Sequence, residues 1–403
     1  MPWDKANHDL ADSKPLPLSR EKDMPDKDHA RITNHEGIKR ILVIKLRHIG
    51  DVLLTLPTIR AIKDCLPNGR ISALVSKGTE PMFTGNPLLE EVIGVDRSLE
   101  LRADLHATWN LFLWMRKRRF DLALDLTGGE RPAFLAWMSG APVRLGWKGN
   151  KKRVFDPARL FTRSTPCDTG TVHEVLKNLH LVNSLGLEAG DLRVDLHWSP
   201  EEELSALLKA KHSGLFLDKP WVHIHPTSRW MFKSWSTRNM ADIVKRLIAA
   251  GEQVLLTCGP GDRECASLKA IHSEVPGGAH FLTGTLTLKE LAVLLSKARL
   301  FVGVDSAPMH MAAAVGTPIV ALFGPSGAFS WGPWDNNNPT DQYPNRNGFQ
   351  SSGPHQVLQR DWPCIPCGND GCRGSKQSLC LMDLSVDEVW KAIEAQLDYL
   401  KGQ

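Results

Sequence analysis

Hydrophobic residues in the first half of the chain recur in short runs, separated by stretches with helical periodicity. The strands and helix that this pattern predicts lie at Arg40–Leu46, 51–65, Ile71–Val75 and Phe120–Leu126. Short apolar runs that alternate with helices are typical of βαβ units, in which parallel strands are buried on both faces. The first half of the chain therefore predicts an α/β domain.

The same alternation begins again after Pro200. Predicted strands lie at Trp221–His225, Gln253–Thr257, Leu300–Val304 and Ile319–Phe323, and predicted helices at Asn239–Ala250, Asp262–Ser273, Leu288–Ser296 and Ala307–Val315. The segment 324–363 is rich in Gly, Pro and Asn, which predicts a long loop. Leu384–Leu400 has the pattern of a final amphipathic helix.

Two such series predict an α/β protein with two Rossmann-like domains. We expect a disordered polar tail over 1–37, a first domain over 38–200, a second over 201–383 and a final helix over 384–403. Ligands of such sheets bind beyond the carboxyl ends of the strands. The cleft between the two domains is therefore the expected site.

The composition of the chain indicates its cellular setting and the charge of its partner. The 403 residues contain no apolar run of about 18 residues and no apolar segment near the N-terminus, so we expect neither a membrane span nor a secretory signal. Eight cysteines without an export signal indicate the reducing cytoplasm. The net charge of +4 does not indicate nucleic-acid binding, but twelve Lys/Arg against five Asp/Glu between Arg102 and Arg159 predict an anionic partner.

The first candidate site, Arg47–Asp51, lies where the first strand turns into the first helix. Gly50 permits close approach of the backbone, and Asp51 is either the N-cap of the helix or a general base at the edge of the cleft. A dinucleotide site would need three glycines at fixed spacing here. The single glycine argues against an NAD-dependent oxidoreductase.

The second candidate site, His225–Arg229 followed by Lys233, also comes directly after a strand. Thr227 and Ser228 offer hydroxyl groups, while Arg229 and Lys233 offer positive charge to a diphosphate leaving group. A solvated basic loop explains the same residues without a function.

The third candidate site, Gly303–His310, joins a strand to a helix. Ser306 is predicted at the helix start, where free backbone N–H groups and the helix dipole favour phosphate. Asp305 is equally a candidate helix cap, and His310 is equally a candidate core residue.

Two further features carry possible chemistry. Cys364, Cys367, Cys372 and Cys380 form a cluster that is either a zinc site or a set of reduced cysteines, and the seven residues inside the second pair argue against zinc. Arg144–Arg153 mixes cations with Trp147, which suits a charged sugar chain or a solvated loop. Trp147 and Trp235 are candidate platforms for sugar stacking.

The order and spacing of these motifs resemble the ADP-heptose:lipopolysaccharide heptosyltransferases, glycosyltransferase family nine. The segments that carry the resemblance are Ile44–Pro57, His225–Trp235, Leu282–Leu291 and Val304–Pro325, within roughly residues 38–400. The cysteine-bearing tail and the form of Arg47–Asp51 look most like the heptosyltransferase III branch, which adds a side-branch heptose to the inner core.

The resemblance implies a GT-B fold with an N-terminal acceptor domain, a C-terminal donor domain and a last helix that crosses back to the first domain. It implies an inverting transfer from ADP-heptose with no obligatory metal or other cofactor. Asp51 matches the base and Lys233 the lysine on the donor phosphates. The other donor-binding positions that it implies are Thr227, Ser228, Arg229, Asp262, Glu264, Leu286, Asp305, Ser306, Ala307 and His310.

On the acceptor side, the resemblance implies an anionic lipid-linked core oligosaccharide. Arg47, His48, Arg144, Lys148 and Lys151 are the residues expected to bind it. We therefore expect a cytoplasmic enzyme that sits peripherally on the inner face of the inner membrane. The alternatives are a related GT-B transferase with another nucleotide sugar, and a non-catalytic nucleotide-sugar-binding protein.

Overall fold

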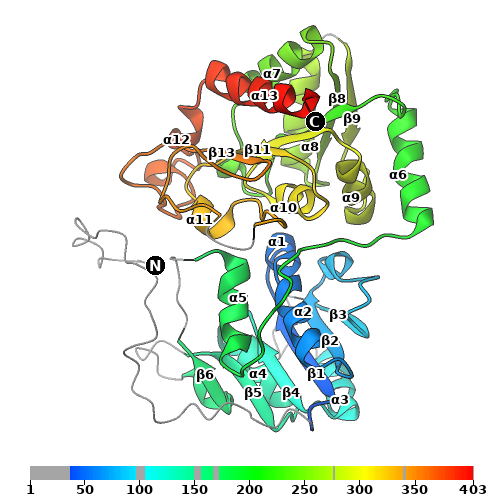
Figure 1. The fold of residues 1–403 in the computed structure, drawn as a ribbon, viewed down its shortest axis with the longest axis vertical. Helices are drawn as coiled ribbons and strands as arrows, with labels where there is room; N and C mark the ends of the chain where they lie inside the picture. Colours follow the sequence, from blue (N-terminus) through cyan, green and yellow to red (C-terminus); the bar gives the residue numbers. More distant parts are fainter. Residues whose placement is uncertain are drawn as a thin grey trace.

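The computed structural model describes residues 37–96, 105–148, 156–166, 172–275, 277–338 and 342–402. The predicted tail over 1–37 lies outside these residues except for Gly37. Two separate sheets form the two lobes of the molecule (Figure 1). The predicted α/β class is thereby confirmed.

The first sheet has six parallel strands in the order β3-β2-β1-β4-β5-β6. Its strands are β1 (Arg40–Lys45), β2 (Arg70–Ser76), β3 (Glu91–Val95), β4 (Leu122–Asp125), β5 (Val143–Trp147) and β6 (Arg163–Thr165). Central β1 is buried on both sides, as its continuous apolar sequence predicts.

Helices cover both faces of the first sheet. Ile41 and Val43 pack in the cluster with α2 (Leu56–Cys65) and α5 (Glu174–Asn183). Leu42 and Ile44 point the other way and pack in the cluster with α3 (Leu105–Arg118) and α4 (Glu130–Met138). The alternation of side chains along one strand thus joins two helical layers.

The second sheet has seven strands in the order β12-β13-β11-β10-β7-β8-β9. Its strands are β7 (Trp221–His225), β8 (Gln253–Cys258), β9 (Ala279–Thr283), β10 (Leu300–Val304), β11 (Ile319–Leu322), β12 (Gln350–Ser352) and β13 (His355–Leu358). One face packs against α7 (Thr237–Ala249), α8 (Asp262–Glu274) and α13 (Val386–Lys401). The other packs against α6 (Pro200–His212), α9 (Leu288–Ser296) and α10 (Ala307–Ala314).

Two expectations from the sequence are wrong here. The segment 324–363 is not one long loop, because it contains α11 (Ala328–Trp331) and the strands β12 and β13, and β13 pairs parallel to β11. The final helix α13 does not cross back to the first domain. Val389, Ile393 and Leu397 are buried in the core of the second sheet, where α13 contacts α7 and β11.

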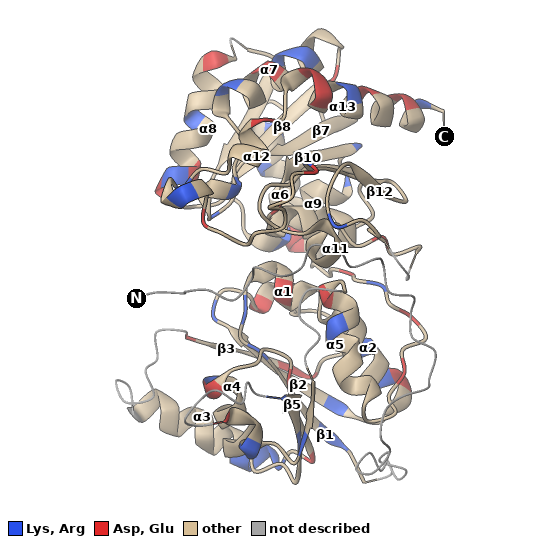
Figure 2. Ribbon diagram, turned by 90° about the vertical axis from the view of Figure 1, so that its left-hand side faces the viewer, with Lys and Arg blue, Asp and Glu red and all other residues tan. Residues whose placement is uncertain are grey.

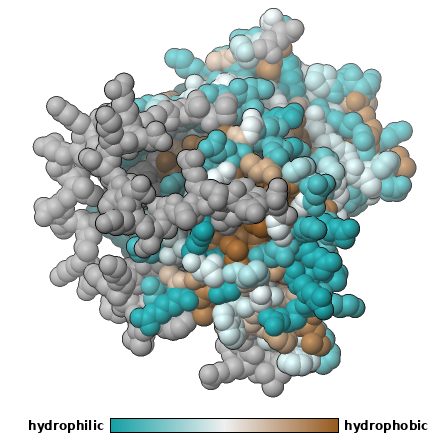
Figure 3. Space-filling model, turned by 60° about the horizontal axis from the view of Figure 1, so that its bottom comes forward, coloured by the Kyte–Doolittle hydropathy of each residue, from teal (hydrophilic) through white to brown (hydrophobic). Residues whose placement is uncertain are grey.

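The two lobes meet where short α1 (Ile49–Leu53) contacts α10. On the first lobe α3 and α4 lie side by side, as Figure 2 also shows. On the face drawn in Figure 3, hydrophobic side chains reach the surface in several places among hydrophilic ones. Among the described residues no helix is both long and apolar enough for a membrane span.

Candidate active site

A cavity of about 1070 Å³ lies where the two sheets face each other. It is lined by residues that follow β1 and β2 of the first sheet and β7, β8 and β10 of the second. The predicted residues that line it are Arg47, His48, Asp51, Thr227, Ser228, Arg229, Lys233, Glu264, Leu286, Asp305, Ser306, Ala307 and His310. The structure therefore gathers three motifs that lie far apart in the sequence into one site.

Asp51 projects from the first turn of α1 into this cavity. The N-cap position belongs to His48, so the interpretation of Asp51 as the cap is wrong. Burial raises the pKa of Asp51 above the ordinary value, and the positive charges of Lys45 and Arg47 partly offset that rise. A carboxylate of raised basicity suits a general base.

Lys45 is a fully buried cation close to Asp51. Its Nζ donates to the Leu126 carbonyl at 2.9 Å, to Glu174 Oε1 at 2.8 Å and to Asn178 Oδ1 at 3.0 Å. All three donor protons of the ammonium are thus used, which is what allows a charged group to remain buried. The network holds the C-terminal end of β1 against α5, just before the turn that leads to Asp51.

Gly50 brings the two lobes into close contact beside the base. A Cβ atom built at Gly50 would lie 2.7 Å from Cδ2 of His310 on α10, so no larger residue fits without movement. Burial lowers the pKa of His310 to about 4 against the opposing effect of Asp305, and the imidazole is neutral at pH 7. Its Nδ1 is buried and has no hydrogen-bond partner among the described residues.

The opposite wall holds a buried ion pair. Lys233 Nζ donates to Asp305 Oδ2 at 2.6 Å, and both side chains are mostly buried. Burial would raise the pKa of Asp305, but the charge and hydrogen bond of Lys233 hold it below the ordinary value. Lys233 is therefore not part of a solvated loop, whereas Arg229 is exposed at the rim.

The start of α10 faces the same space. Ser306 is the N-cap, but its Oγ donates to the Val304 carbonyl at 3.1 Å and makes no cap bond. The side chain of the cap therefore does not occupy the free N–H groups of the first turn. Asp305, the other candidate cap, is instead the partner of Lys233.

Of the two acidic candidates on α8, only Glu264 lines the cavity; Asp262 does not. The carboxylate of Glu264 accepts hydrogen bonds from the backbone N–H groups of Gly259 and Gly261. Thr227 Oγ1 donates to its Oε1 at 3.5 Å. The two glycines leave space for this carboxylate, because a Cβ at either one would lie within 3 Å of it.

Known proteins that are similar to this chain show which family it belongs to. The family model described as glycosyltransferase family 9 (heptosyltransferase) matches residues 108–346. The chain belongs to this family. It is 31% identical to lipopolysaccharide heptosyltransferase 3 of Escherichia coli over 295 residues, which are 72% of this chain and 85% of that protein.

Two solved structures share the fold of this glycosyltransferase. The family 9 glycosyltransferase from Veillonella parvula superimposes with a TM-score of 0.71 at 23% identity and covers 90% of this chain and 97% of its own. The ADP-heptose lps heptosyltransferase II of E. coli gives a TM-score of 0.69 at 20% identity, with coverages of 90% and 99%. The two facing sheets are thus the GT-B fold, as expected.

The predicted acceptor cations of the transferase are only partly at the cavity. Arg144 lies at the amino end of β5, where its guanidinium donates to the carbonyls of Ala141 and Leu160, and Lys148 also lies away from the cavity. Lys151 is outside the described residues. Arg144 lies at the opposite edge of the sheet from the cleft, whereas Lys148 follows β5 at the carboxyl edge but does not line the cavity. The basic character of the segment does not specify where along the sheet each cation lies.

Several residues of the cleft were not predicted from the sequence. Lys77 follows β2 at the carboxyl edge of the first sheet, and Trp230 contacts His48 across the cleft with ring centroids 4.7 Å apart. Trp147 and Trp235, the proposed stacking platforms, are buried and do not line this cavity. The position of Trp230 beside the His225–Arg229 motif is the signal that could have found it.

The cysteine cluster does not contribute to the cleft. Cys364 and Cys367 are exposed, Cys380 is buried, and all are free thiols. Burial and the three neighbouring cysteines raise the pKa of Cys380 to about 11, so it is protonated at pH 7. In the described part of the chain, no three His, Cys, Asp or Glu residues are arranged to hold a metal ion.

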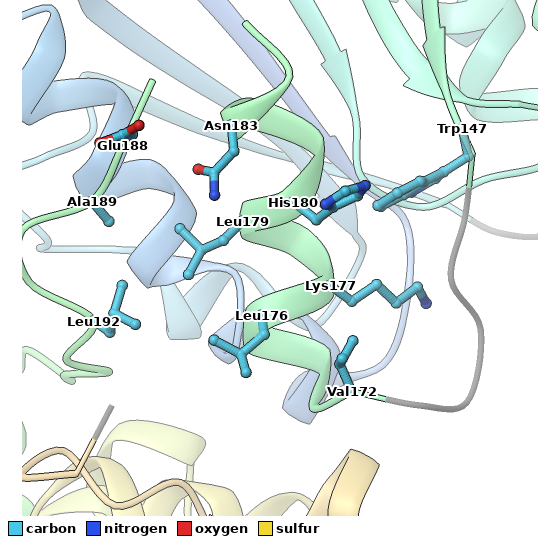
Figure 4. A pocket seen from close by; sticks show the side chains of 10 residues that line it. All are labelled: Trp147, Val172, Leu176, Lys177, Leu179, His180, Asn183, Glu188, Ala189 and Leu192. Carbon is cyan, nitrogen blue, oxygen red and sulfur yellow. The ribbon is translucent and has the colours of Figure 1, made fainter. Parts of the chain in front are cut away.

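A second cavity of about 480 Å³ lies on the outer side of α5 (Figure 4). His180 lies beside Trp147 in it, and Leu176 and Leu192 form an apolar wall. Of the residues singled out from the sequence, only Trp147 lines this cavity, and the cavity shares no lining residue with the cleft that holds Asp51.

Proposed function

We propose that this glycosyltransferase moves heptose from ADP-L-glycero-D-manno-heptose to the inner core of lipopolysaccharide. The observation that supports the proposal is that Asp51 from one lobe and the Lys233–Asp305 pair and Ser306 from the other line one cavity. A base for the acceptor and a cationic site for the donor diphosphate are the two parts that such a transfer needs.

The proposed step is a single displacement. Asp51 takes the proton of an acceptor hydroxyl, whose oxygen attacks the anomeric carbon of the donor. The bond from that carbon to the phosphate oxygen breaks, ADP leaves and the configuration is inverted. Family membership and the raised pKa of Asp51 support its role as the base.

Lys233 and the first turn of α10 would stabilise the charge that develops on ADP. Thr227, Ser228 and Arg229 border the same space, and Glu264 and Leu286 would contact the nucleoside. These groups supply the positive charge that a metal ion would otherwise bring to the diphosphate. We therefore expect transfer to continue when EDTA removes metal ions.

The acceptor in this proposal is an anionic, lipid-linked core oligosaccharide at the inner face of the inner membrane. Arg47, His48 and Lys77 on the first lobe offer the nearest cations and ring surface for it. The match to a lipopolysaccharide heptosyltransferase 3 supports transfer of a side-branch heptose.

A mass-spectrometric transfer assay tests the proposal. Purified protein is incubated with truncated core acceptors and with ADP-heptose, UDP-sugars or GDP-sugars. We expect the mass of the acceptor to increase by one heptose residue when ADP-heptose is the donor, and to stay unchanged with UDP-sugars or GDP-sugars. Transfer from another nucleotide sugar would favour the related-transferase alternative, and no transfer with any donor would favour the non-catalytic one.

The role of Asp51 is tested by Asp51→Asn, which keeps the shape and removes the basicity. We expect kcat to fall by roughly 10²–10⁴-fold while donor affinity, measured by calorimetry, stays unchanged. Asp64→Asn, an exposed residue on α2, is the matched control and should leave kcat unaltered. A variant at Asp51 with full activity would exclude this base.

A further inference from the structure

Outside the cleft, the first lobe carries an unusual surface formed by α3 and α4. We define the α3–α4 face as Trp109, Phe112, Leu113, Phe134 and Trp137. Trp109, Leu113 and Trp137 are 57%, 47% and 51% exposed, although large apolar side chains are normally buried. Two adjacent helices thus both expose large apolar side chains to solvent.

Helical spacing explains how this face arises. Trp109 and Leu113, one helical turn apart, are exposed on α3, whereas Met115 is buried and Phe112 and Trp114 are half-buried against the core. The rings of Trp109 and Phe112 are 5.4 Å apart, and on α4 the rings of Phe134 and Trp137 stack at 5.5 Å. Each exposed tryptophan therefore rests on a half-buried phenylalanine that is anchored against the core.

Arg116 joins the two helices at the edge of the face. Its guanidinium lies 5.9 Å from the ring of Phe112 and fills the space where a Cβ at Gly140, just after α4, would stand. Figure 2 shows α3 and α4 side by side, with basic residues at the C-terminal end of α3. The aromatic pairs and the cations thus belong to one surface.

The charge around the face is strongly one-sided. We define the basic rim as Arg116, Lys117 and Arg119, all exposed, none of which forms an ion pair among the described residues. Arg118 is different, since Glu91 neutralises it at 2.9 Å. α3 contains no acidic residue and α4 contains only Glu130.

Another helix with exposed apolar side chains, α6, lacks this combination. On α6, Leu204 and Leu208 are 60% and 46% exposed, but the helix has no aromatic residue and begins with three glutamates. Exposure of apolar side chains is thus common to both helices, whereas paired aromatics with a cationic rim occur on the α3–α4 face.

We propose that the α3–α4 face is a docking surface for an anionic lipid bilayer. Tryptophan and phenylalanine side chains partition to the boundary between headgroups and acyl chains, and nearby lysine and arginine are attracted to anionic headgroups. A bilayer fits both parts of this surface. Its apolar interior accepts the aromatic side chains, and its anionic headgroups attract the basic rim, so neither a second copy of the chain nor a protein partner is required.

The face is also connected to the cleft. α4 begins directly after the loop at the carboxyl end of β4, and Arg47 of the cleft donates to the Thr127 carbonyl in that loop at 3.1 Å. A bilayer against α4 would therefore present lipid-linked acceptors to the acceptor side of the cavity. Only this last step rests on the proposed function.

Vesicle sedimentation tests the docking surface without any transfer reaction. The full chain is mixed with vesicles of phosphatidylethanolamine and phosphatidylglycerol, or of phosphatidylcholine alone. We expect binding to the anionic vesicles that weakens in high salt, and at least about tenfold weaker binding for the Trp109→Ser/Trp137→Ser and Lys117→Glu/Arg119→Glu double variants. The control Leu204→Ser/Leu208→Ser on α6 should bind like the unaltered protein.

Transfer to a water-soluble, delipidated acceptor separates docking from catalysis. The surface variants should retain it, which shows that they are folded; should the tryptophan variant fail to fold, the charge-reversal variant and Leu113→Ser carry the test. Equal vesicle binding by all variants would overturn the proposal. So would a dimer in solution that buries Trp109. Failure of transfer by every protein, with normal vesicle binding, would count against the proposed function alone.

Discussion

At the scale of single residues, the protonation of Asp51 should set how activity depends on pH. Only the deprotonated carboxylate accepts a proton, so kcat/KM should fall as the pH drops through the pKa of Asp51. Because burial raises that pKa, the acidic limb should lie above the ordinary aspartate value of about 3.9. A profile of kcat/KM against pH measures it.

Lys45 provides a check on this assignment. Its positive charge lowers the pKa of Asp51, whereas Glu174 raises it. Lys45→Met removes the first effect and leaves the second, so the acidic limb should move to higher pH. A limb that stays in place would show that another group controls the profile.

Lys233 is expected to serve both stability and catalysis. Lys233→Ala leaves the buried carboxylate of Asp305 without its cation, which should cost about 3–5 kcal/mol of unfolding free energy. We also expect kcat/KM to fall by roughly 10²–10³-fold, since one stabilising group for the leaving diphosphate is lost. Urea unfolding and steady-state kinetics measure the two effects.

Lys233→Arg is the matched variant, because it retains the charge. It should recover most of the stability and part of the rate. If Lys233→Ala were inactive but fully stable, the pair with Asp305 would not be a structural ion pair.

At the scale of elements, α1 and α10 approach each other so closely that Gly50 cannot carry a side chain. Gly50→Ala should favour α1 itself by up to about 1 kcal/mol, because glycine is a poor helix former. Its methyl group would nevertheless collide with His310, so we expect kcat/KM to fall by about tenfold or more as the two helices separate.

Small-angle scattering should show whether the lobes of this variant move apart. Gly190→Ala, where a Cβ meets nothing within 4 Å, is the control and should behave like the unaltered protein. Full activity of Gly50→Ala would mean that the α1–α10 contact is not needed for transfer.

At the scale of the whole molecule, buried neutral histidines should make the fold sensitive to acid. Burial lowers the pKa of His223 to about 3 and those of His173, His225, His310 and His355 to about 4. The unfolded chain binds these protons near pH 6.5. Stability is therefore complete above pH 6.5 and is lost as the pH falls toward 4, by at most about 1.4 kcal/mol per pH unit for each histidine.

Urea unfolding at several pH values between 7 and 4.5 measures this slope. His355→Gln, on β13 and outside the cavity, should reduce the slope by the contribution of one histidine, at most about 1.4 kcal/mol per pH unit. A stability that is constant down to pH 5 would contradict the assignment.

The sequence by itself determined the local elements and their order. Continuous apolar runs such as Arg40–Lys45 specify buried parallel strands, and the turns that follow β1, β7 and β10 carry the polar motifs. Those motifs fall at the carboxyl ends of strands for a general topological reason, so their presence in one cleft could be predicted. The family followed from the same segments.

Only the tertiary structure decided which individual side chains reach the cleft. Asp262 and Glu264 are two residues apart, yet the turn of α8 brings only Glu264 to the cavity. The described cations of 102–159 do not line the cavity; several of them instead lie at the α3–α4 face. The docking of α13 on the second sheet was likewise settled by packing. Periodicity fixes which face of an element is apolar, but the partner of that face is chosen by shape and burial across the whole chain.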